Sequence, residues 1–156
     1  MTVEIERRFL LADDSWREAA GEPLELQQGY LSVEKERTIR VRIIGSQAWL
    51  TLKGYISDMT RSEFEYEIPL AHAQAMMADM CPFKMEKYRY RVEFEGFVYE
   101  IDEYFGDNAP LIVVEIELPS EDTEFPKPSW LGKEITADGK FTNAYLSKHP
   151  YSSWTE

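Results

Sequence analysis

Hydrophobic and polar positions alternate along most of this chain. In the first run, "VEIERRFL", Glu4, Glu6 and Arg8 fall on one side, while Ile5 and Phe9 fall on the other. Alternate side chains of a β-strand point to opposite faces, so this pattern predicts a strand. Six further runs alternate in the same way: TIRVRII, AWLTLKG, RSEFEYEIP, KYRYRVEF, VYEIDEYF and LIVVEIEL.

Helical signals are fewer than strand signals. The stretch "ADDSWREAAG" predicts a short helix, Leu70 to Met80 lies between two prolines and predicts another, and "GKFTNAYLSKHP" predicts a last helix that ends before Pro150. The gaps "IIGSQAW" and "FEGFV" are typical of hairpin turns. Many consecutive strands with a few helices indicate an α+β fold with an antiparallel sheet, whose apolar outer faces we expect helices to cover.

Length and composition favour one domain over residues 1–156. The chain has no apolar run of about 20 residues and no signal-peptide pattern, so we expect a cytoplasmic protein that does not enter membranes. The net charge of −12 makes nucleic acid a poor partner. The single cysteine, Cys81, lies among apolar residues and is expected to be buried. A homodimer stays open.

The charged faces of these strands group residues of like sign. Acidic groups are Glu4/Glu6, Glu63/Glu65/Glu67 and Glu115/Glu117, and basic groups are Arg40/Arg42 and Lys87/Arg89/Arg91. Residues two apart on a strand lie roughly 6.5–7 Å apart, where like charges repel. A wet sheet face explains one such strand better than it explains all of them.

A ligand inside a closed sheet would turn this repulsion into affinity. A barrel of about eight strands has room for one small ligand. Clustered carboxylates bind hard cations such as Mg²⁺ or Mn²⁺, and clustered Arg and Lys bind phosphate oxygens. The two kinds of row together predict a metal–polyphosphate complex in the interior.

The motifs in this order resemble a known family. "EIERRFL" is similar to the N-terminal ExExK signature of the CYTH proteins, the triphosphate tunnel metalloenzymes, and especially of their small bacterial triphosphatases. The resemblance continues through LQQGYL, TIRVR, LTLKG, RSEFEYEI, EKYRY, YEIDEYF, VVEIEL and WLGKEIT. It implies an eight-stranded antiparallel β-barrel, a tunnel with a charged interior and a few covering helices, with the C-terminal helix closing one end. Members hydrolyse inorganic or thiamine triphosphate, or cyclise ATP.

The resemblance also implies roles for individual residues. The residues implied to bind phosphate are Arg8, Arg40, Arg42, Lys53, Lys87 and Arg89. Those implied to surround Mg²⁺ or Mn²⁺ are Glu4, Glu6, Glu63, Glu65, Asp102, Glu115 and Glu117. Those implied to act in catalysis are Arg8, Tyr30 and Lys87. Glu67 continues the acidic row and is expected at the tunnel rim, and Arg61 and Arg91 are similarly placed and secondary. The Tyr30 phenol either donates to a phosphate, helps orient a general base, or simply packs at the start of a strand.

Arg8 departs from the family pattern, which usually has Lys at this position. Arg holds a phosphate with a planar fork, but it is bulkier and does not easily lose a proton. Inorganic triphosphate is the substrate we expect first. Adenylate cyclase and thiamine triphosphatase activities stay open. A non-catalytic polyphosphate binder also stays open, and Arg8 is the feature that favours this alternative.

Overall fold

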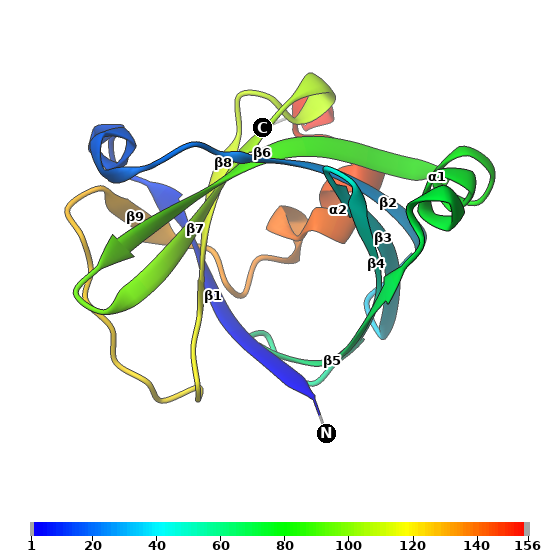
Figure 1. Ribbon diagram of the computed structural model, residues 1–156. Helices are drawn as coiled ribbons and strands as arrows, with labels where there is room; N and C mark the ends of the chain where they lie inside the picture. The colour runs from blue at the N-terminus through cyan, green and yellow to red at the C-terminus, as the bar shows by residue number, and fades with distance from the viewer. Residues whose placement is uncertain (1, 155–156) are drawn as a thin grey trace.

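The structure is a computed structural model, and it describes residues 2–154. Figure 1 shows a ring of strands around a short helix. The strands are β1 (Val3–Leu11), β2 (Leu24–Glu34), β3 (Arg37–Ile44), β4 (Gln47–Tyr55), β5 (Thr60–Ile68), β6 (Phe83–Phe94), β7 (Phe97–Tyr104), β8 (Ile112–Glu117) and β9 (Leu131–Glu134). The α-helices are α1 (Leu70–Asp79) and α2 (Asn143–Lys148). Single 3-10 turns are η1 (Ser15–Ala19), η2 (Gly106–Asn108), η3 (Gly139–Phe141) and η4 (Tyr151–Ser153).

Eight of the strands form a closed antiparallel barrel, in the order β5-β4-β3-β2-β6-β7-β8-β1. Pairing of Val3 with Ser62 and of Ile5 with Thr60 joins β1 to β5 and closes the ring. The hairpin turns lie where the sequence predicts them, with positive φ at Gly45 (59°) and Gly96 (85°). The predicted fold class and the seven alternating strands are therefore confirmed.

Two strands lie outside the alternating runs. β2 is not revealed by alternation of charge, because its inward side carries the uncharged Leu26, Gln28 and Tyr30. β9 has four residues, too few to show a period. It pairs with the second half of β1, where Phe9 lies opposite Glu134 on one edge and Val114 on the other.

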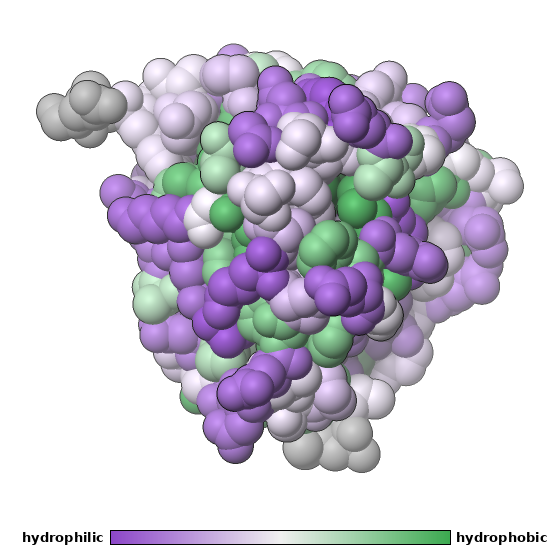
Figure 2. Space-filling view, turned by 90° about the vertical axis from the view of Figure 1, so that its left-hand side faces the viewer, coloured by the Kyte–Doolittle hydropathy of each residue, from purple (hydrophilic) through white to green (hydrophobic). Residues whose placement is uncertain are grey.

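The cover of the outer faces differs from the expectation in two ways: parts of it are not helical, and on β5 the outward Phe64 and Tyr66 are exposed. On β1, β7 and β8, outward side chains such as Phe9, Tyr99 and Ile116 form a core with Trp16 of η1 and Trp130. The cover here is η1 and the irregular connection between β8 and β9, because both bring a tryptophan onto the sheet. Figure 2 shows this side of the molecule, with hydrophilic and hydrophobic side chains interspersed.

The helix α1 covers β3 and β4 from outside, as Figure 1 shows, and its span agrees with the predicted helix. Its core contains Val41, Ala73 and Cys81, and Cys81 is buried as expected. Gly29 of β2 permits this close approach, since a Cβ there would lie 2.6 Å from Met77 Sδ. Within residues 2–154, the helices are all too short or too polar to cross a membrane.

The helix α2 lies inside the ring of strands (Figure 1). Its Leu146 is fully buried against Met85, Tyr104 and Val113, which are inward-facing residues of β6, β7 and β8. The C-terminal helix therefore fills one end of the barrel, as the family resemblance implies. The stretch "GKFTNAYLSKHP" forms η3 and α2, and "SWREA" forms the 3-10 turn η1 in place of an α-helix.

Candidate active site

The register of the strands divides the inner wall into an acidic and a basic part. Neighbouring strands β5, β1, β8 and β7 carry the inward carboxylates, and Glu6 lies directly opposite Glu117 while Arg8 lies opposite Glu115. The strands β3 and β6, on either side of β2, carry Arg40, Arg42, Lys87 and Arg89, and Lys53 lies on β4. Arg8 is the exception, because it lies on β1 among the carboxylates. The rows of like charge recognised in the sequence thus face one interior.

A cavity of about 600 Å³ lies between these inner faces and the segment from Thr136 to His149. Of the predicted site residues, seven line it: Glu4, Glu6, Arg8, Tyr30, Arg40, Lys53 and Glu115. The other seven predicted site residues belong to the described part of the chain but do not line the cavity: Arg42, Glu63, Glu65, Lys87, Arg89, Asp102 and Glu117. Both signs of charge therefore meet at one hollow of ligand size.

Lys53 and Glu4 form an ion pair at the cavity wall. The Lys53 Nζ lies 2.8 Å from Glu4 Oε1 and 3.7 Å from Glu63 Oε2. Burial opposes both charges, but the mutual attraction outweighs it, so the pKa of Glu4 is lowered and the pKa of Lys53 is raised. Both groups are ionised at neutral pH.

The surroundings of Glu6 disfavour its negative charge, in contrast to those of Glu4. Burial, together with the nearby Glu115 and Glu4 carboxylates, raises the pKa of Glu6 to about 8. The Arg8 Nη1 atom, 3.4 Å from Glu6 Oε1, only partly compensates. A further cation at these carboxylates would relieve their repulsion.

The chemistry of this donor set suits a hard divalent cation. Carboxylate oxygens are the ligands that Mg²⁺ and Mn²⁺ prefer, and Glu4, Glu6 and Glu115 all line the cavity. Within residues 2–154, no three His, Cys, Asp or Glu side chains converge on one point as they would around a metal. Glu4 is instead held by Lys53, and Glu115 lies 3.5 Å from Arg89.

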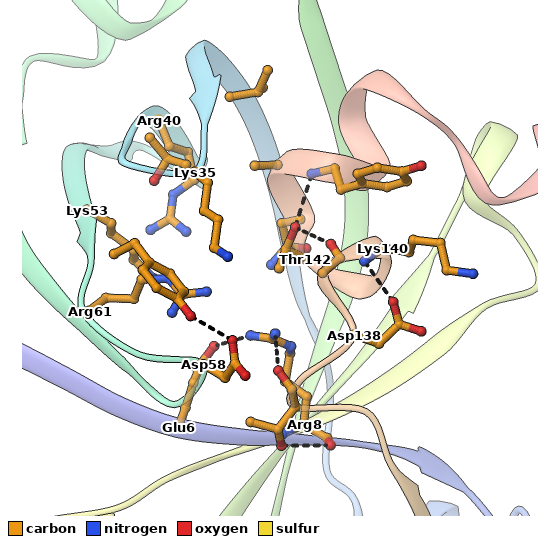
Figure 3. A pocket seen from close by; sticks show the side chains of 18 of the residues that line it. Glu6, Arg8, Lys35, Arg40, Lys53, Asp58, Arg61, Asp138, Lys140 and Thr142 are labelled. Carbon is orange, nitrogen blue, oxygen red and sulfur yellow. Dashed lines mark hydrogen bonds and ion pairs between the residues drawn. The ribbon is translucent and has the colours of Figure 1, made fainter.

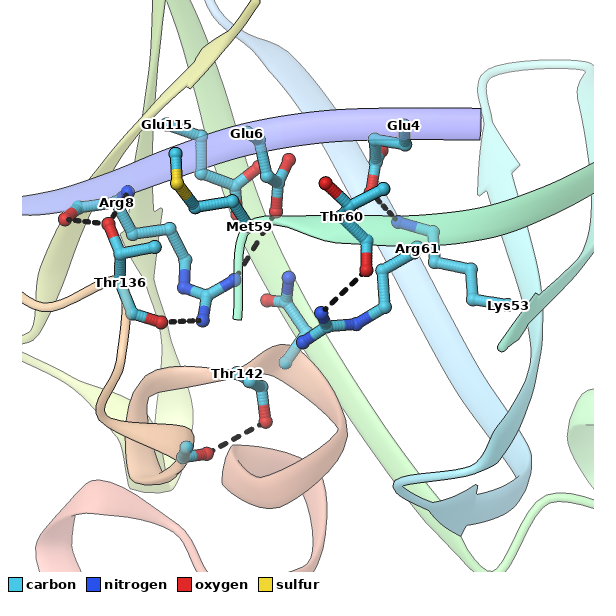
Figure 4. Close-up of polar contacts among 12 residues, drawn as sticks. Glu4, Glu6, Arg8, Lys53, Met59, Thr60, Arg61, Glu115, Thr136 and Thr142 are labelled. Carbon is cyan, nitrogen blue, oxygen red and sulfur yellow. Dashed lines mark hydrogen bonds and ion pairs between the residues drawn. The ribbon is translucent and has the colours of Figure 1, made fainter. Parts of the chain in front are cut away.

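Arg8 connects β1 to the segment that follows β9. Its Nη2 donates to the Thr136 carbonyl at 3.1 Å, and its backbone N–H donates to Thr136 Oγ1 at 3.0 Å (Figure 4). The side chain is only 6% exposed, yet its Nε has no hydrogen-bond partner among the described residues. Arg40 also lines the cavity, and its Nε is likewise buried without a hydrogen-bond partner within residues 2–154. An oxyanion in the cavity would suit both donors.

Tyr30 and Arg42 extend the basic wall. Tyr30 lies opposite Arg40 and is buried, and burial raises its pKa, so the phenol keeps its proton. Burial and the neighbouring Arg40 and Arg89 lower the pKa of Arg42, whose Nε donates to Gln28 at 2.9 Å. Arg40, Arg42 and Arg89 are therefore close enough to disfavour one another's charge, which an anion bound beside them would relieve.

A second cluster lies behind the cavity and is fully hydrogen-bonded. The buried Asp102 accepts from Lys87 Nζ at 2.6 Å and from Arg89 Nε and Nη2 at 2.8 and 2.9 Å. Lys87 also donates to Asn143 Oδ1 of α2 at 3.2 Å. Direct contact of Lys87 or Arg89 with phosphate, and of Asp102 with metal, stays a prediction.

The remaining predicted residues are more exposed. Glu65 is exposed, accepts from Thr51 Oγ1 at 2.8 Å and lies 3.7 Å from Arg40 Nη2. Glu67 and Arg91 are exposed as well. Arg61, ranked as secondary, does line the cavity.

Sequence reasoning missed several lining residues near the mouth (Figure 3). Lys35 Nζ lies 4.0 Å from the ring centre of Tyr55, whose hydroxyl donates to Asp58 at 2.8 Å. Arg61 lies on the same ring, with its Cζ 5.0 Å from the centre. Lys35 and Asp58 sit in turns between strands, where no alternation assigns them to a face.

Residues 2–144 match the family described as the CYTH domain. The chain belongs to this family. The predicted resemblance is therefore confirmed, and the match covers most of the chain.

Two curated relatives span the domain. An inorganic triphosphatase from Acetivibrio thermocellus is 40% identical over 157 residues, covering 100% of each chain. An inorganic triphosphatase from Nitrosomonas europaea is 33% identical over 149 residues, covering 93% of this chain and 97% of the relative.

Solved structures agree with the fold. The crystal structure of the inorganic triphosphatase NE1496 superposes with a TM-score of 0.66 at 32% identity, covering 94% of this chain and 95% of that one. The PH1012 protein from Pyrococcus horikoshii OT3 has a TM-score of 0.61 at 16% identity, covering 76% and 80%, and supports the fold alone.

Proposed function

We propose that this CYTH domain hydrolyses inorganic triphosphate bound in its cavity, with the help of a divalent metal ion. The observation that carries the proposal is the cavity itself, where Arg8, Arg40 and Lys53 meet Glu4, Glu6 and Glu115. Full-length similarity to bacterial inorganic triphosphatases supports the choice of reaction and substrate.

The cations that line the cavity would hold the phosphate chain. Arg8 and Arg40 each have a buried guanidinium N–H free for a phosphate oxygen among the described residues, and Lys53 would exchange Glu4 for phosphate. Arg42, Lys87 and Arg89 belong to the same proposal. Their positive charge reaches the cavity from behind the lining even where they make no contact.

Glu4, Glu6 and Glu115 are the residues we assign to Mg²⁺ or Mn²⁺, and Glu63, Glu65, Asp102 and Glu117 would surround this group. When bound, the metal neutralises phosphate oxygens and polarises water. Since the Glu6 pKa is about 8, protons compete with the cation for this residue at neutral pH.

The reaction needs little covalent chemistry from the protein. Water attacks the terminal phosphorus, the anhydride P–O bond breaks, and orthophosphate and pyrophosphate leave. Arg8, Arg40 and Lys53 hold the chain in line and stabilise the charge that develops on its oxygens. The protonated Tyr30 would donate to a phosphate oxygen or orient the attacking water, and Lys87 would contribute positive charge.

A substrate panel tests the proposal. Inorganic triphosphate, thiamine triphosphate and ATP are each incubated with Mg²⁺, Mn²⁺ or EDTA, and orthophosphate and pyrophosphate are measured. We expect metal-dependent release of both from inorganic triphosphate, at the highest kcat/KM of the three. Cyclic AMP with pyrophosphate from ATP would indicate a cyclase, and triphosphate binding without any turnover would indicate a binder; either overturns the proposal.

Two further proposals concern the setting in which the domain works. The cytoplasm is the compartment we propose, and cell fractionation tests it. A homodimer is left open by the sequence, and light scattering of the purified protein decides it.

A further inference from the structure

Asn143 is held in one orientation at the start of α2. Its Oδ1 accepts hydrogen bonds from Lys87 Nζ at 3.2 Å and from Tyr104 Oη at 2.6 Å. A lysine ammonium has only donors, so the amide atom that faces it must be the oxygen. Burial and the nearby Asp102 raise the pKa of Tyr104, which keeps that phenol a donor as well. The amide nitrogen therefore points away from both.

The Asn143 side chain lies between this buried cluster and the cavity, so an amide nitrogen that points away from the cluster points towards the cavity. Asn143 lines the cavity, while Lys87 and Tyr104, both fully or almost fully buried, do not. Within residues 2–154 the Asn143 Nδ2 atom makes no hydrogen bond. Its neighbour Thr142 lies on the same wall, facing Arg8 and Arg61 across the hollow (Figures 3 and 4).

We propose that Asn143 is a substrate-binding residue whose Nδ2 donates a hydrogen bond to a non-bridging oxygen of the bound triphosphate. This inference rests on the proposed function of the cavity. Lys87 and Asp102 then act through Asn143 by fixing its amide. A hydrogen bond from a cation to the amide oxygen also polarises the amide and strengthens its N–H donor.

A neutral donor at this position fixes where a phosphate oxygen binds more closely than the arginines and lysines of the site do. Each Lys or Arg attracts phosphate over several ångströms, whereas an amide N–H needs an acceptor at hydrogen-bond distance. Because α2 also fills the end of the barrel, Asn143 sets where one end of the phosphate chain stops. We therefore expect it to affect affinity for triphosphate directly.

Two variants remove the donor in different ways. Asn143→Asp keeps an oxygen for Lys87 and Tyr104 but replaces the donor by an acceptor, and Asn143→Leu removes the donor without adding charge. We expect both to raise the KM for triphosphate at least about tenfold. The rise for Asn143→Leu should persist at high salt, because it does not depend on charge repulsion.

Tyr104→Phe is the matched control. It removes one hydrogen bond from Asn143 Oδ1 inside the same buried cluster but leaves the Nδ2 donor in place. We expect its KM to stay within about threefold of wild type, with any loss seen in the thermal midpoint. A KM change in Tyr104→Phe as large as that in Asn143→Leu would overturn the proposal, since the effect would then be a general one on the cluster.

Calorimetric titration of inorganic triphosphate in the presence of Mg²⁺ separates this proposal from the function it rests on. If wild type hydrolyses no triphosphate, the proposed function fails while the dissociation constants of the variants still test Asn143. If wild type is active and both Asn143 variants keep wild-type KM and affinity, only the Asn143 proposal fails.

Discussion

The Lys53 ammonium on β4 lies 2.8 Å from the Glu4 carboxylate on β1, although β5 separates the two strands in the sheet. A residue assigned to phosphate and a residue assigned to metal thus neutralise each other in this structure. Binding of a metal–triphosphate complex would give each a new partner of the correct sign. The pair therefore links the stability of the barrel to its function.

Lys53→Met is expected to reduce kcat/KM for triphosphate by about 100-fold or more, because a cation that stabilises developing phosphate charge is lost. It should also lower the free energy of unfolding by about 1–3 kcal/mol, since Glu4 is left without its partner. Phosphate-release assays and urea denaturation measure the two effects.

The double variant Glu4→Gln/Lys53→Met separates stability from activity. It should recover part of the lost stability while staying inactive, because the buried Glu4 charge no longer lacks its partner. Lys133→Met, on the exposed part of β9, is the matched control and should behave as wild type. An active Lys53→Met enzyme would contradict the role assigned to Lys53.

Glu6 predicts how stability changes with pH. Its folded pKa of about 8 lies above the usual 4.5, so the folded protein holds this proton more tightly than the unfolded chain does. The contribution of Glu6 is therefore fully present below about pH 4.5 and is lost as the pH rises through about 8. At pH 9 in EDTA, the unfolding free energy of Glu6→Gln should exceed that of wild type by at most roughly 5 kcal/mol. Urea denaturation of the two proteins measures this difference.

The same comparison at pH 4.5 should show little difference between Glu6→Gln and wild type. Saturating Mg²⁺ should stabilise wild type more at pH 9 than at pH 6, because the ionised carboxylate is the metal ligand. Glu67→Gln, at an exposed position, is the control and should follow the wild-type pH profile. An unchanged profile for Glu6→Gln would show that Glu6 titrates normally.

Gly29→Ala tests the packing of α1 independently of the site. The added methyl group would lie 2.6 Å from Met77 Sδ and 2.9 Å from both Cβ and Sγ of Cys81. We expect a loss of about 1–3 kcal/mol in unfolding free energy with unchanged KM, because α1 lies outside the barrel. Gly21→Ala, with no atom within 4 Å of its new methyl group, should be nearly neutral. Equal stability of the two variants would contradict this account.

Much of the barrel could be predicted because its strands separate charge from apolar residues. The alternation in "RSEFEYEI" fixes which side of β5 faces the interior, and closure of the sheet then determines which rows meet. Contacts made by residues outside strands could not be predicted in this way. Lys35 belongs to a turn, and Asn143 reaches the cavity only because α2 enters the barrel.

The sequence also could not rank the cations. Arg40 and Arg42 share one face of one strand, yet Arg40 lines the cavity and Arg42 lies behind it, hydrogen-bonded to Gln28. Lys87 carries the same charge as Lys53 but is buried on Asp102. Depth along the barrel axis separates these residues, and period-two alternation carries no information on depth.

Arg8 is the position where the chain departs from the family's usual lysine, and its contacts predict what a lysine would change. The guanidinium reaches both Glu6 and the Thr136 carbonyl, whereas an ammonium on a flexible stem lacks the fork that spans them. Arg8→Lys should keep kcat/KM within about threefold, because the positive charge remains, and lose about 1 kcal/mol of stability with the Thr136 contact. Arg8→Met should lose about 100-fold or more in kcat/KM. Phosphate-release kinetics and thermal denaturation of the two variants check this, and a large gain in rate for Arg8→Lys would show that the native arginine impairs catalysis.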